Sequence, residues 1–397
     1  MSLKPAKPTL TKGVGLGAAM LMATSAIGPG FLTQTTVFTQ QLLSSFGFVI
    51  FITLLLDIGA QLNIWRILVV SESKAQDVAN TLLPGLGYVL AALVILGGFA
   101  FNIANVGGAG LGLRAMLGFD VTTGALITGT CAIAIFWFNH VGQLVDKMVK
   151  IFALIMIVLT LIVAVIAHPP MAQVIQHTFI PQQTSALAVV TLVGGTVGGY
   201  ISFAGAHRLL DGGLRGTAAL PLVDRSAVTG IVITSIMRFS LFIAALGVIT
   251  AGTVLDAANP TATVFGAAAG QVGYRFFGVV MWCASITSVI GAAYTSVSFL
   301  TTFHPLLLRY NKWLVTVFIV SSTMIFVLIG KPVSLLVAAG AINGFILPAG
   351  LAIVLLAAAR KRLMGSYKHP VWLQIAGWLV VLAVGWLALK SFYSWLA

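Results

Sequence analysis

The chain has 397 residues, of which 59% are hydrophobic and only 7% are charged. This composition excludes an ordinary soluble domain, in which about 25% of residues are charged. Lys and Arg total 21 against 8 Asp and Glu, but in so apolar a chain the excess indicates membrane topology and lipid contact, and no nucleic-acid partner is expected. The expected fold class is an all-α integral membrane protein.

Hydropathy and turn signals predict eleven segments that reach the roughly 20 apolar residues a membrane-spanning helix needs. The first segment stays in the chain, because the polar start MSLKPAKPTLTKG and the long apolar run after it do not resemble a cleavable signal. The expected helices cover residues 13–42, 46–70, 85–113, 121–139, 148–167, 187–209, 226–254, 274–302, 313–330, 333–359 and 371–395.

The basic residues divide unequally between the two sides that eleven helices define. Sixteen Lys and Arg lie on the side of the N-terminal tail, four lie on the other side, and Arg238 falls inside a predicted span. Loops rich in Lys and Arg stay in the cytoplasm. We therefore predict a multi-pass protein of the cytoplasmic (inner) membrane, with its N-terminus in the cytoplasm and its C-terminus outside.

An interruption of the first helix is predicted in the stretch AIGPGFLTQTTVFTQQ, which covers residues 26–41. Pro29 removes a backbone donor, and Gly28 and Gly30 loosen the helix around it. Transporters place such half-helix ends at mid-membrane, facing a substrate. The alternative is a proline kink whose threonines bond back to their own helix. On the first interpretation the substrate-binding candidates are Thr33, Gln34, Thr35 and Thr36.

The sixth predicted helix carries four glycines within six residues: Gly194, Gly195, Gly198 and Gly199. Each costs about 1 kcal/mol relative to alanine inside a helix, which indicates a second break; close helix packing is the alternative. Breaks five helices apart predict two inverted repeats. The chain would then be one membrane domain with a tail (1–12), a first repeat (13–167, helices 1–5), a second repeat (187–359, helices 6–10) and helix eleven (371–395). Gly198, Gly199, Tyr200 and, on helix ten, Asn343 complete the substrate-binding candidates.

Three stretches and the eleven-helix plan together resemble the natural resistance-associated macrophage protein (NRAMP) family. The stretches are Gly28-Pro29-Gly30, GGTVGGY at 194–200 and NGFILP at 343–348. The resemblance implies a LeuT-type fold and proton-coupled import of manganese, iron and related divalent ions. Family members hold the ion with an Asp-Pro-Gly-Asn motif and with the Met of Met-Pro-His.

This chain departs from both family motifs. It has no Asp or Asn from 13 to 50, and Gly198-Gly199-Tyr200 stands where Met-Pro-His would fall. Where the family has proton-linked acids on helix three, we place Asn102 and Asn105 as candidates for coupling. The resemblance therefore predicts the fold better than the substrate, and the metal ligands are unknown.

Other polar residues at or near membrane depth are further coupling candidates. Asp57 is the acid well inside a predicted span, and such residues are often functional; Arg238 is a possible partner for it, which would make a structural ion pair. His207, after the second break, could couple or gate because histidine titrates near neutrality, or it could simply belong to a polar helix end. Asp120 and Asp224 are expected to cap helices, and Trp65 is expected at the membrane interface.

The sequence favours a secondary transporter, acting as a symporter by alternating access. It has no G-x-S-x-G, H-E-x-x-H or P-loop motif, so no enzyme activity and no cofactor are expected. The first substrate hypothesis is a divalent cation that keeps part of its water shell, as magnesium does. The alternative is a small polar organic solute or anion, whose acidic group would meet half-helix N-termini. A third possibility is a non-transporting receptor, and in each case we expect a monomer.

Overall fold

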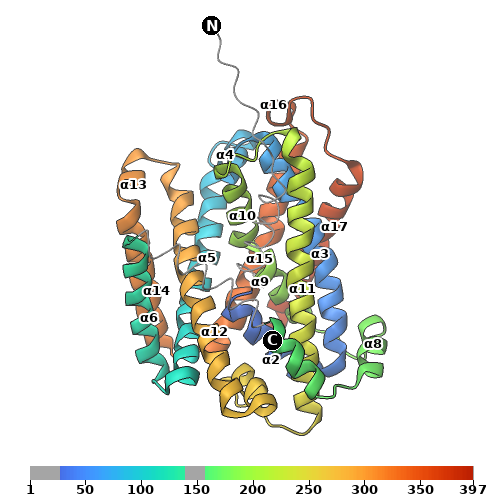
Figure 1. The fold of residues 1–397 in the computed structure, drawn as a ribbon. Helices are drawn as coiled ribbons and strands as arrows, with labels where there is room; N and C mark the ends of the chain where they lie inside the picture. Colours follow the sequence, from blue (N-terminus) through green and yellow to red (C-terminus); the bar gives the residue numbers. More distant parts are fainter. Residues whose placement is uncertain (1–26, 139–156, 397) are drawn as a thin grey trace.

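The computed structural model describes residues 27–138 and 157–396, and this part of the chain is helical without a strand (Figure 1). A helix at Ile157–Ile166 precedes α8, and two short turns are η1 (Leu43–Ser45) and η2 (Thr217–Ala219). The other helices are α2 (Pro29–Leu42), α3 (Phe46–Ser71), α4 (Ala75–Leu82), α5 (Leu86–Leu117), α6 (Val121–Trp137), α8 (Met171–Phe179), α9 (Ala186–Thr196), α10 (Gly199–Asp211), α11 (Leu220–Thr250), α12 (Pro260–Thr301), α13 (Pro305–Arg309), α14 (Asn311–Ile329), α15 (Pro332–Ala358), α16 (Lys361–Met364) and α17 (Val371–Leu396).

Eight helical segments in the described part are long and apolar enough to cross a membrane. A ninth results if Ile157–Ile166 and α8, which are bent by 113° relative to each other, form one broken span. The beginnings of predicted helices one and five lie outside the described residues, and α6 has only 17 residues. The all-helical membrane fold is confirmed, whereas the count of eleven and the division into repeats at 13–167 and 187–359 remain predictions.

The core of the bundle is organised around α5, which packs tightly along α12. A Cβ added at Gly112 would lie 2.6 Å from Trp282 N, and one added at Gly278 would lie 2.6 Å from Met116 N. Neither position has room for a methyl group, so the two backbones approach as small residues allow in membranes. Because α5 also contacts α4, α6, α14 and α15, it joins helices from both halves of the chain.

The helix predicted over 274–302 begins earlier, at Pro260. Asn259 caps it by accepting a hydrogen bond from Ala262 N (3.3 Å), and Pro260 suits a first helical position. The two pieces of α12 meet at Ala269 and Gly270, where Gly270 has φ 60°. Hydropathy missed the first piece because the kink and Arg275 interrupt the apolar run.

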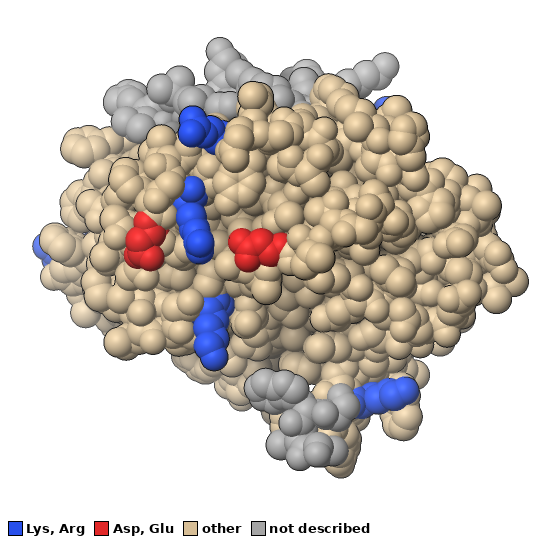
Figure 2. All heavy atoms as spheres, turned by 90° about the horizontal axis from the view of Figure 1, so that it is seen from below, with Lys and Arg blue, Asp and Glu red and all other residues tan. Residues whose placement is uncertain are grey.

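The described loops among those that the charge pattern places in the cytoplasm lie at one end of the bundle, the top in Figure 1, near α4 and α16. There Gly216 N donates to Val69 O (2.9 Å) and Ala75 N donates to His207 Nε2 (3.1 Å). The opposite face is mostly uncharged, and several of its charged side chains of both signs lie close together (Figure 2). Which of the two ends is cytoplasmic remains a prediction.

Large apolar side chains point outward along α14 and α17. Leu328 is 85% exposed and Trp386 is 69% exposed. Such surfaces are stable where lipid tails, rather than water, cover them, while the backbone bonds stay within each helix. These helices therefore form part of the lipid-facing surface.

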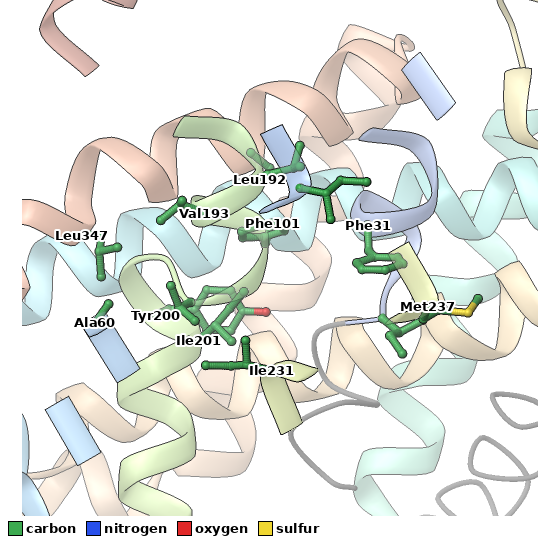
Figure 3. Packing of buried hydrophobic residues seen from close by; sticks show 14 of the residues in the cluster. Phe31, Ala60, Phe101, Leu192, Val193, Tyr200, Ile201, Ile231, Met237 and Leu347 are labelled. Carbon is green, nitrogen blue, oxygen red and sulfur yellow. The ribbon is translucent and has the colours of Figure 1, made fainter. Parts of the chain in front are cut away.

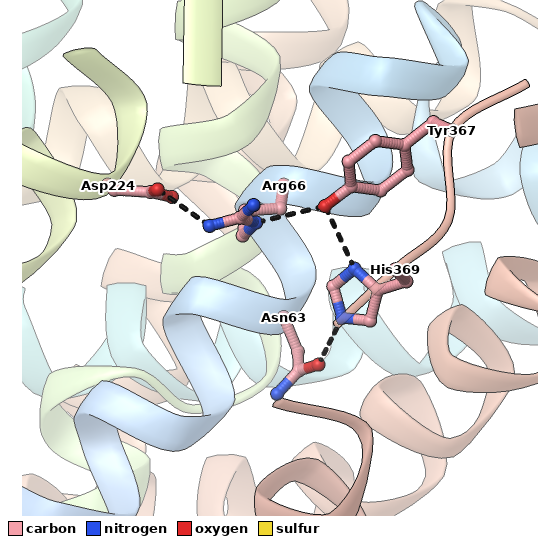
Figure 4. Close-up of polar contacts among 5 residues, drawn as sticks. All are labelled: Asn63, Arg66, Asp224, Tyr367 and His369. Atoms are coloured by element: carbon pink, nitrogen blue, oxygen red, sulfur yellow. Dashed lines mark hydrogen bonds and ion pairs between the residues drawn. The ribbon is translucent and has the colours of Figure 1, made fainter. Parts of the chain in front are cut away.

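At the end of the bundle near α4 and α16, a network of polar side chains links α3, α11 and the segment before α17 (Figure 4). Arg66 Nη1 forms a 2.6 Å salt bridge with Asp224 Oδ2, and Arg66 Nε donates to the Tyr367 hydroxyl (3.1 Å). His369 Nε2 lies 2.8 Å from Asn63 Oδ1. Because the Asn63 amide nitrogen already donates to Gly59 O and Leu373 O, His369 Nε2 must be the donor in this bond.

The two expected helix caps have different outcomes. Asp120 caps α6, accepting hydrogen bonds from Thr122 N (3.0 Å) and Thr123 N (3.1 Å), as predicted. The prediction for Asp224 is wrong: its carboxylate pairs with Arg66 on α3. A cap is a local motif that sequence can indicate, whereas this pair depends on two helices meeting in space.

The His369 network predicts a pH-dependent stability. Burial, and next the Arg66 charge, lowers the pKa of His369 from 6.5 to about 4. Between these two pKa values the His369 side chain binds a proton in the unfolded chain but not in the folded chain. The stability that neutral, buried His369 contributes to folding is therefore complete above pH 6.5 and is lost as pH falls toward 4. We expect a loss of about 1–3 kcal/mol from this residue on going from neutral pH to about pH 4, measured by equilibrium unfolding.

His369→Gln should flatten that pH dependence. His168→Asn is the matched control, because His168 is exposed and its positive φ of 45° suits asparagine. An equally steep profile in His369→Gln would contradict the prediction.

Candidate functional site

The sixth predicted helix is broken near its middle, as expected. It consists of α9, which ends at Thr196, and α10, which begins at Gly199. Val197 has φ −125° and ψ 5°, and Gly198 is extended, with ψ 163°. The Ser202 hydroxyl donates to Val197 O (2.7 Å), which satisfies one carbonyl released by the break. The N-terminal end of α10, with its partial positive charge, therefore lies inside the bundle.

The described part of the first predicted helix begins at the Gly-Pro-Gly sequence. Gly28 is extended (φ −104°, ψ −175°), and Pro29 is the first residue of α2. The stretch before Ile27 lies outside the described residues, so a preceding half-helix remains a prediction. Pro29 packs against Gly108 of α5, where a Cβ would lie 3.0 Å from Pro29 Cγ. The start of α2 is thus held against the centre of the bundle.

Gln34 links α2 to the other two helices around the break. Its Nε2 donates to Leu336 O of α15 (2.8 Å). A Cβ added at Gly195 of α9 would lie 2.6 Å from Gln34 Oε1, so the glycine makes room for this amide. Gln34 Oε1 is buried and has no hydrogen-bond partner in the described structure, which leaves one acceptor facing α9 just before the break.

The threonine hydroxyls of α2 bond mainly within their own helix. Thr35 donates to Phe31 O (2.7 Å), Thr36 donates to Leu32 O (3.2 Å), and Thr39 donates to Thr35 O (2.6 Å). This is the alternative that the sequence left open for these side chains. Each hydroxyl oxygen can still accept a hydrogen bond. Thr36 Oγ1 accepts one from the Thr261 hydroxyl of α12 (3.1 Å). Thr33 is also buried, at 2% exposure.

Asn343 fastens α15 to the start of α10. Its Nδ2 donates to Gly97 O (2.9 Å) and Ala339 O (3.0 Å), while its Oδ1 accepts from Tyr200 N (3.3 Å). The amide therefore caps α10 from another helix and has no spare donor. The Tyr200 ring lies 5.5 Å from that of Phe101 in the apolar surroundings of the break (Figure 3).

Arg238 of α11 reaches the break from the other side. Its Nη1 donates to Thr196 Oγ1 (3.0 Å), at the last residue of α9, and its guanidinium carbon lies 4.3 Å from the centre of the Phe31 ring. Arg238 Nε and Nη2 are buried without a partner in the described part of the chain. Asp57 of α3 interacts with both Thr196 and the Arg238 charge, and its Oδ1 is also unpartnered there. Among the described residues, Asp57 and Arg238 therefore interact through their charges without a direct salt bridge.

The remaining coupling candidates lie farther along their helices. Asn102 Nδ2 donates to Ser322 Oγ of α14 (3.0 Å), and its Oδ1 is unpartnered in the described structure; Asn105 is buried on the same helix. His207 holds α10 against α4 by accepting from Ala75 N, and it stacks on Phe299 with ring centres 4.6 Å apart.

The chain is similar to known membrane proteins over nearly its whole length. The family described as natural resistance-associated macrophage protein-like, or Nramp, matches residues 19–394. The chain belongs to the Nramp family. Its relative in Bacillus subtilis (strain 168), the uncharacterized membrane protein YcsG, is 54% identical over 369 residues, covering 93% of this chain and 91% of the relative. The Nramp chain is therefore a multi-pass membrane transporter and not an enzyme.

Two solved structures show the same fold at low sequence identity. A mutant of the Eremococcus coleocola manganese transporter has a TM-score of 0.71 at 18% identity, covering 99% of this chain and 89% of that one. MhsT in complex with L-phenylalanine has a TM-score of 0.64 at 16% identity, covering 97% and 98%. The predicted LeuT-type fold is thereby confirmed.

Ligand chemistry at the break differs from that of a dehydrated metal site. No group of three or more His, Cys, Asp or Glu that could hold an ion occurs in the described part of this Nramp chain. Carboxylates and soft sulfur normally compensate for the lost water of divalent ions. At the break the described polar side chains supply amides, hydroxyls, one guanidinium and one carboxylate.

Three contributors to the site were missed from the sequence: Thr196, Phe31 and the Leu336 carbonyl. Thr196 could have been selected from the sequence, because its hydroxyl comes just before the predicted break and can hydrogen-bond to polar groups that face the break. Trp65 was misplaced at the interface; it is buried and donates through Nε1 to Ser202 O (3.0 Å). Trp65 is buried because α3 packs against α10.

Proposed function

We propose that this Nramp chain is a secondary transporter that binds its substrate between the start of α2 and the α9–α10 break and moves it by alternating access. The observation that carries the proposal is the unwound backbone at Val197 and Gly198, in the middle of a span, with buried Gln34 and Arg238 beside it. Irregular backbone persists at membrane depth where it is buried in protein or lines a cavity, and two helix ends facing each other can hold and release a solute.

The first substrate candidate is a divalent metal cation, which membership of the Nramp family and the likeness to a manganese transporter favour. The neutral oxygens near the break would hold such an ion through part of its water shell, because one acid cannot compensate for full dehydration. Gln34 Oε1, which is buried without a partner in the described residues, is the first contact we assign to that shell.

The second candidate is a small polar organic solute or anion, which a specific observation favours. Arg238 places a positive charge at the break, where it repels a cation and attracts an acidic group. MhsT shows that this fold can hold an organic molecule such as L-phenylalanine.

Uptake by purified protein in proteoliposomes tests the proposal. We expect saturable uptake of Mn²⁺ or Mg²⁺ if the first candidate is right, and of a small carboxylate if the second is right. Binding without flux of any of these solutes would identify a receptor and overturn the transport proposal.

Replacing Gln34 by alanine should impair transport under either candidate. The variant loses both the bond to Leu336 O and the acceptor facing Gly195, and we expect uptake at limiting substrate to fall about tenfold, the effect of losing roughly one good polar contact. Gln173→Ala, at an exposed position on α8, is the control. Unchanged uptake in Gln34→Ala would remove Gln34 from the site.

A further inference from the structure

The guanidinium of Arg238 has hydrogen-bonding capacity that the described structure does not use. Arg238 is only 3% exposed, yet its Nε and Nη2 lack partners there. Leaving charged donors unpaired in a buried position is costly. Nε and one Nη of an arginine can bind the two oxygens of a carboxylate in a planar, bidentate arrangement. The unused pair therefore matches a carboxylate in shape and in charge.

The surroundings of Arg238 place this capacity at the transport site. Nη1 is tied to Thr196, one residue before the unwound segment, and the Phe31 ring lies against the guanidinium plane. These two contacts fix the orientation of the side chain and leave Nε and Nη2 without a partner among the described residues. The first turn of α10 adds the partial positive charge of a helix N-terminus. Both features favour an anion at the break.

Asp57 supplies the charge balance when no substrate is bound. Among the elements packed against α3, Arg238 of α11 carries the charge that interacts with Asp57, and α9 and α15 have no titratable side chain. The titratable groups on the other packed elements, and the remaining ones on α11, lie toward the ends of the helices, except Tyr200 beside the break: His177 on α8; His207, Arg208 and Asp211 on α10; Asp224 and Arg225 on α11; Asp77 on α4; Lys361 and Arg362 on α16; Lys390 and Tyr393 on α17.

A second anion near Arg238 changes the protonation state that is favourable for Asp57. Two carboxylates cannot both remain ionised beside one guanidinium in a buried site without a large electrostatic cost. The Thr196 hydroxyl donates to Leu192 O and accepts from Arg238, which leaves one lone pair that can accept a hydrogen bond from the O–H of a neutral Asp57. Thr196 is near enough to interact with Asp57, so we assign it as the acceptor for neutral Asp57.

Resting on the proposed function, we propose that the substrate is a small organic carboxylate bound by Nε and Nη2 of Arg238, and that Asp57 takes up a proton when it binds. The anion and one proton then cross the membrane together, and both leave on the far side. No covalent step is involved, and the Arg238 charge is balanced in each state. The chain is on this basis a carboxylate and proton symporter.

Binding is tested first, by thermal unfolding of the full chain in detergent with acetate, lactate, pyruvate, succinate and glutamate, each compared with its amide. At least one carboxylate should raise Tm while its amide does not. Arg238→Gln should lower the affinity for it by about tenfold or more, whereas Arg208→Gln, an exposed arginine on α10, should keep it. If Arg238→Gln does not fold, Arg238→Lys retains the charge opposite Asp57 and should still lose the bidentate binding.

Asp57→Asn separates the proposed role from a merely structural one. The carboxylate that binds should raise Tm more in this variant than in the wild type, because the ligand then supplies the missing counter-charge to Arg238. In proteoliposomes, a pH gradient should accelerate uptake of that carboxylate by the wild type, and Asp57→Asn should lose this acceleration.

Three results would overturn the inference: stabilisation by none of the five carboxylates, equal binding of a carboxylate by Arg238→Gln, or unchanged pH-gradient dependence in Asp57→Asn. Saturable uptake of Mn²⁺ or Mg²⁺ by Arg238→Gln would overturn it while leaving the proposed transport function intact. Absence of flux for both metal ions and all five carboxylates would instead overturn the proposed function.

Discussion

Replacing Gly194 by valine is expected to prevent stable assembly of the bundle around the break. A Cβ at this position would lie 2.8 Å from Gly344 Cα and would also clash with Gly340 O and Gly344 N. These are backbone atoms of α15, so no side chain can rotate away. We expect a loss of at least about 3 kcal/mol in the free energy of unfolding, at the upper end for overpacking, measured by equilibrium unfolding in mixed micelles.

The control is Gly291→Val on α12. A Cβ at Gly291 would meet only the end of the Arg208 side chain, 3.8 Å away, so both variants add the same apolar group to a membrane helix and differ in the space available. Equal stability of the two variants would show that α9 and α15 are not in close backbone contact.

Removing Asp57 alone is expected to destabilise the protein strongly, whereas removing both Asp57 and Arg238 should restore much of the loss. Both side chains are buried, at 1% and 3% exposure. Asp57→Ala leaves the Arg238 charge uncompensated, and breaking a buried pair from one side typically costs about 3–5 kcal/mol. In Asp57→Ala with Arg238→Met the uncompensated charge is absent, because an apolar side chain replaces it.

A double-mutant cycle measures this coupling from the unfolding free energies of the wild type, both single variants and the double variant. Asp77→Ala is the control, because Asp77 lies on α4 outside the spans and interacts with Lys74 rather than with Arg238. Additive effects of the Asp57 and Arg238 substitutions would mean that the two charges do not interact, which would also remove the charge-balance step from the symport proposal.

The break in helix six could be predicted from the chain because its cause is local. Four glycines in six residues lower the helical preference wherever the segment lies, and the unwound residues Val197 and Gly198 fall among them. The polar candidates Gln34, Asn343 and Arg238 could also be selected, since polar side chains inside apolar runs are few and costly.

The use of those side chains could not be predicted in the same way. Asn343 caps α10 from 143 residues away, and the α2 threonines mostly bond to their own carbonyls. His369, on a polar connection, is buried against Asn63 of α3. Hydrogen bonds of this kind depend on which helices meet and at what height, and hydropathy carries no information on either.

The sequence by itself determined that this Nramp chain is helical, lies in a membrane and opens helix six at its glycines, because composition, span length and backbone preference are properties of each segment alone. Only the tertiary structure decided that Thr196 and Asp57 lie near Arg238, that two donors of Arg238 have no partner among the described residues, and that α9 and α15 touch through glycine. These features arise where α3, α9, α11 and α15 converge, and the energy of a buried charge depends on its neighbours in space rather than on its neighbours in the chain.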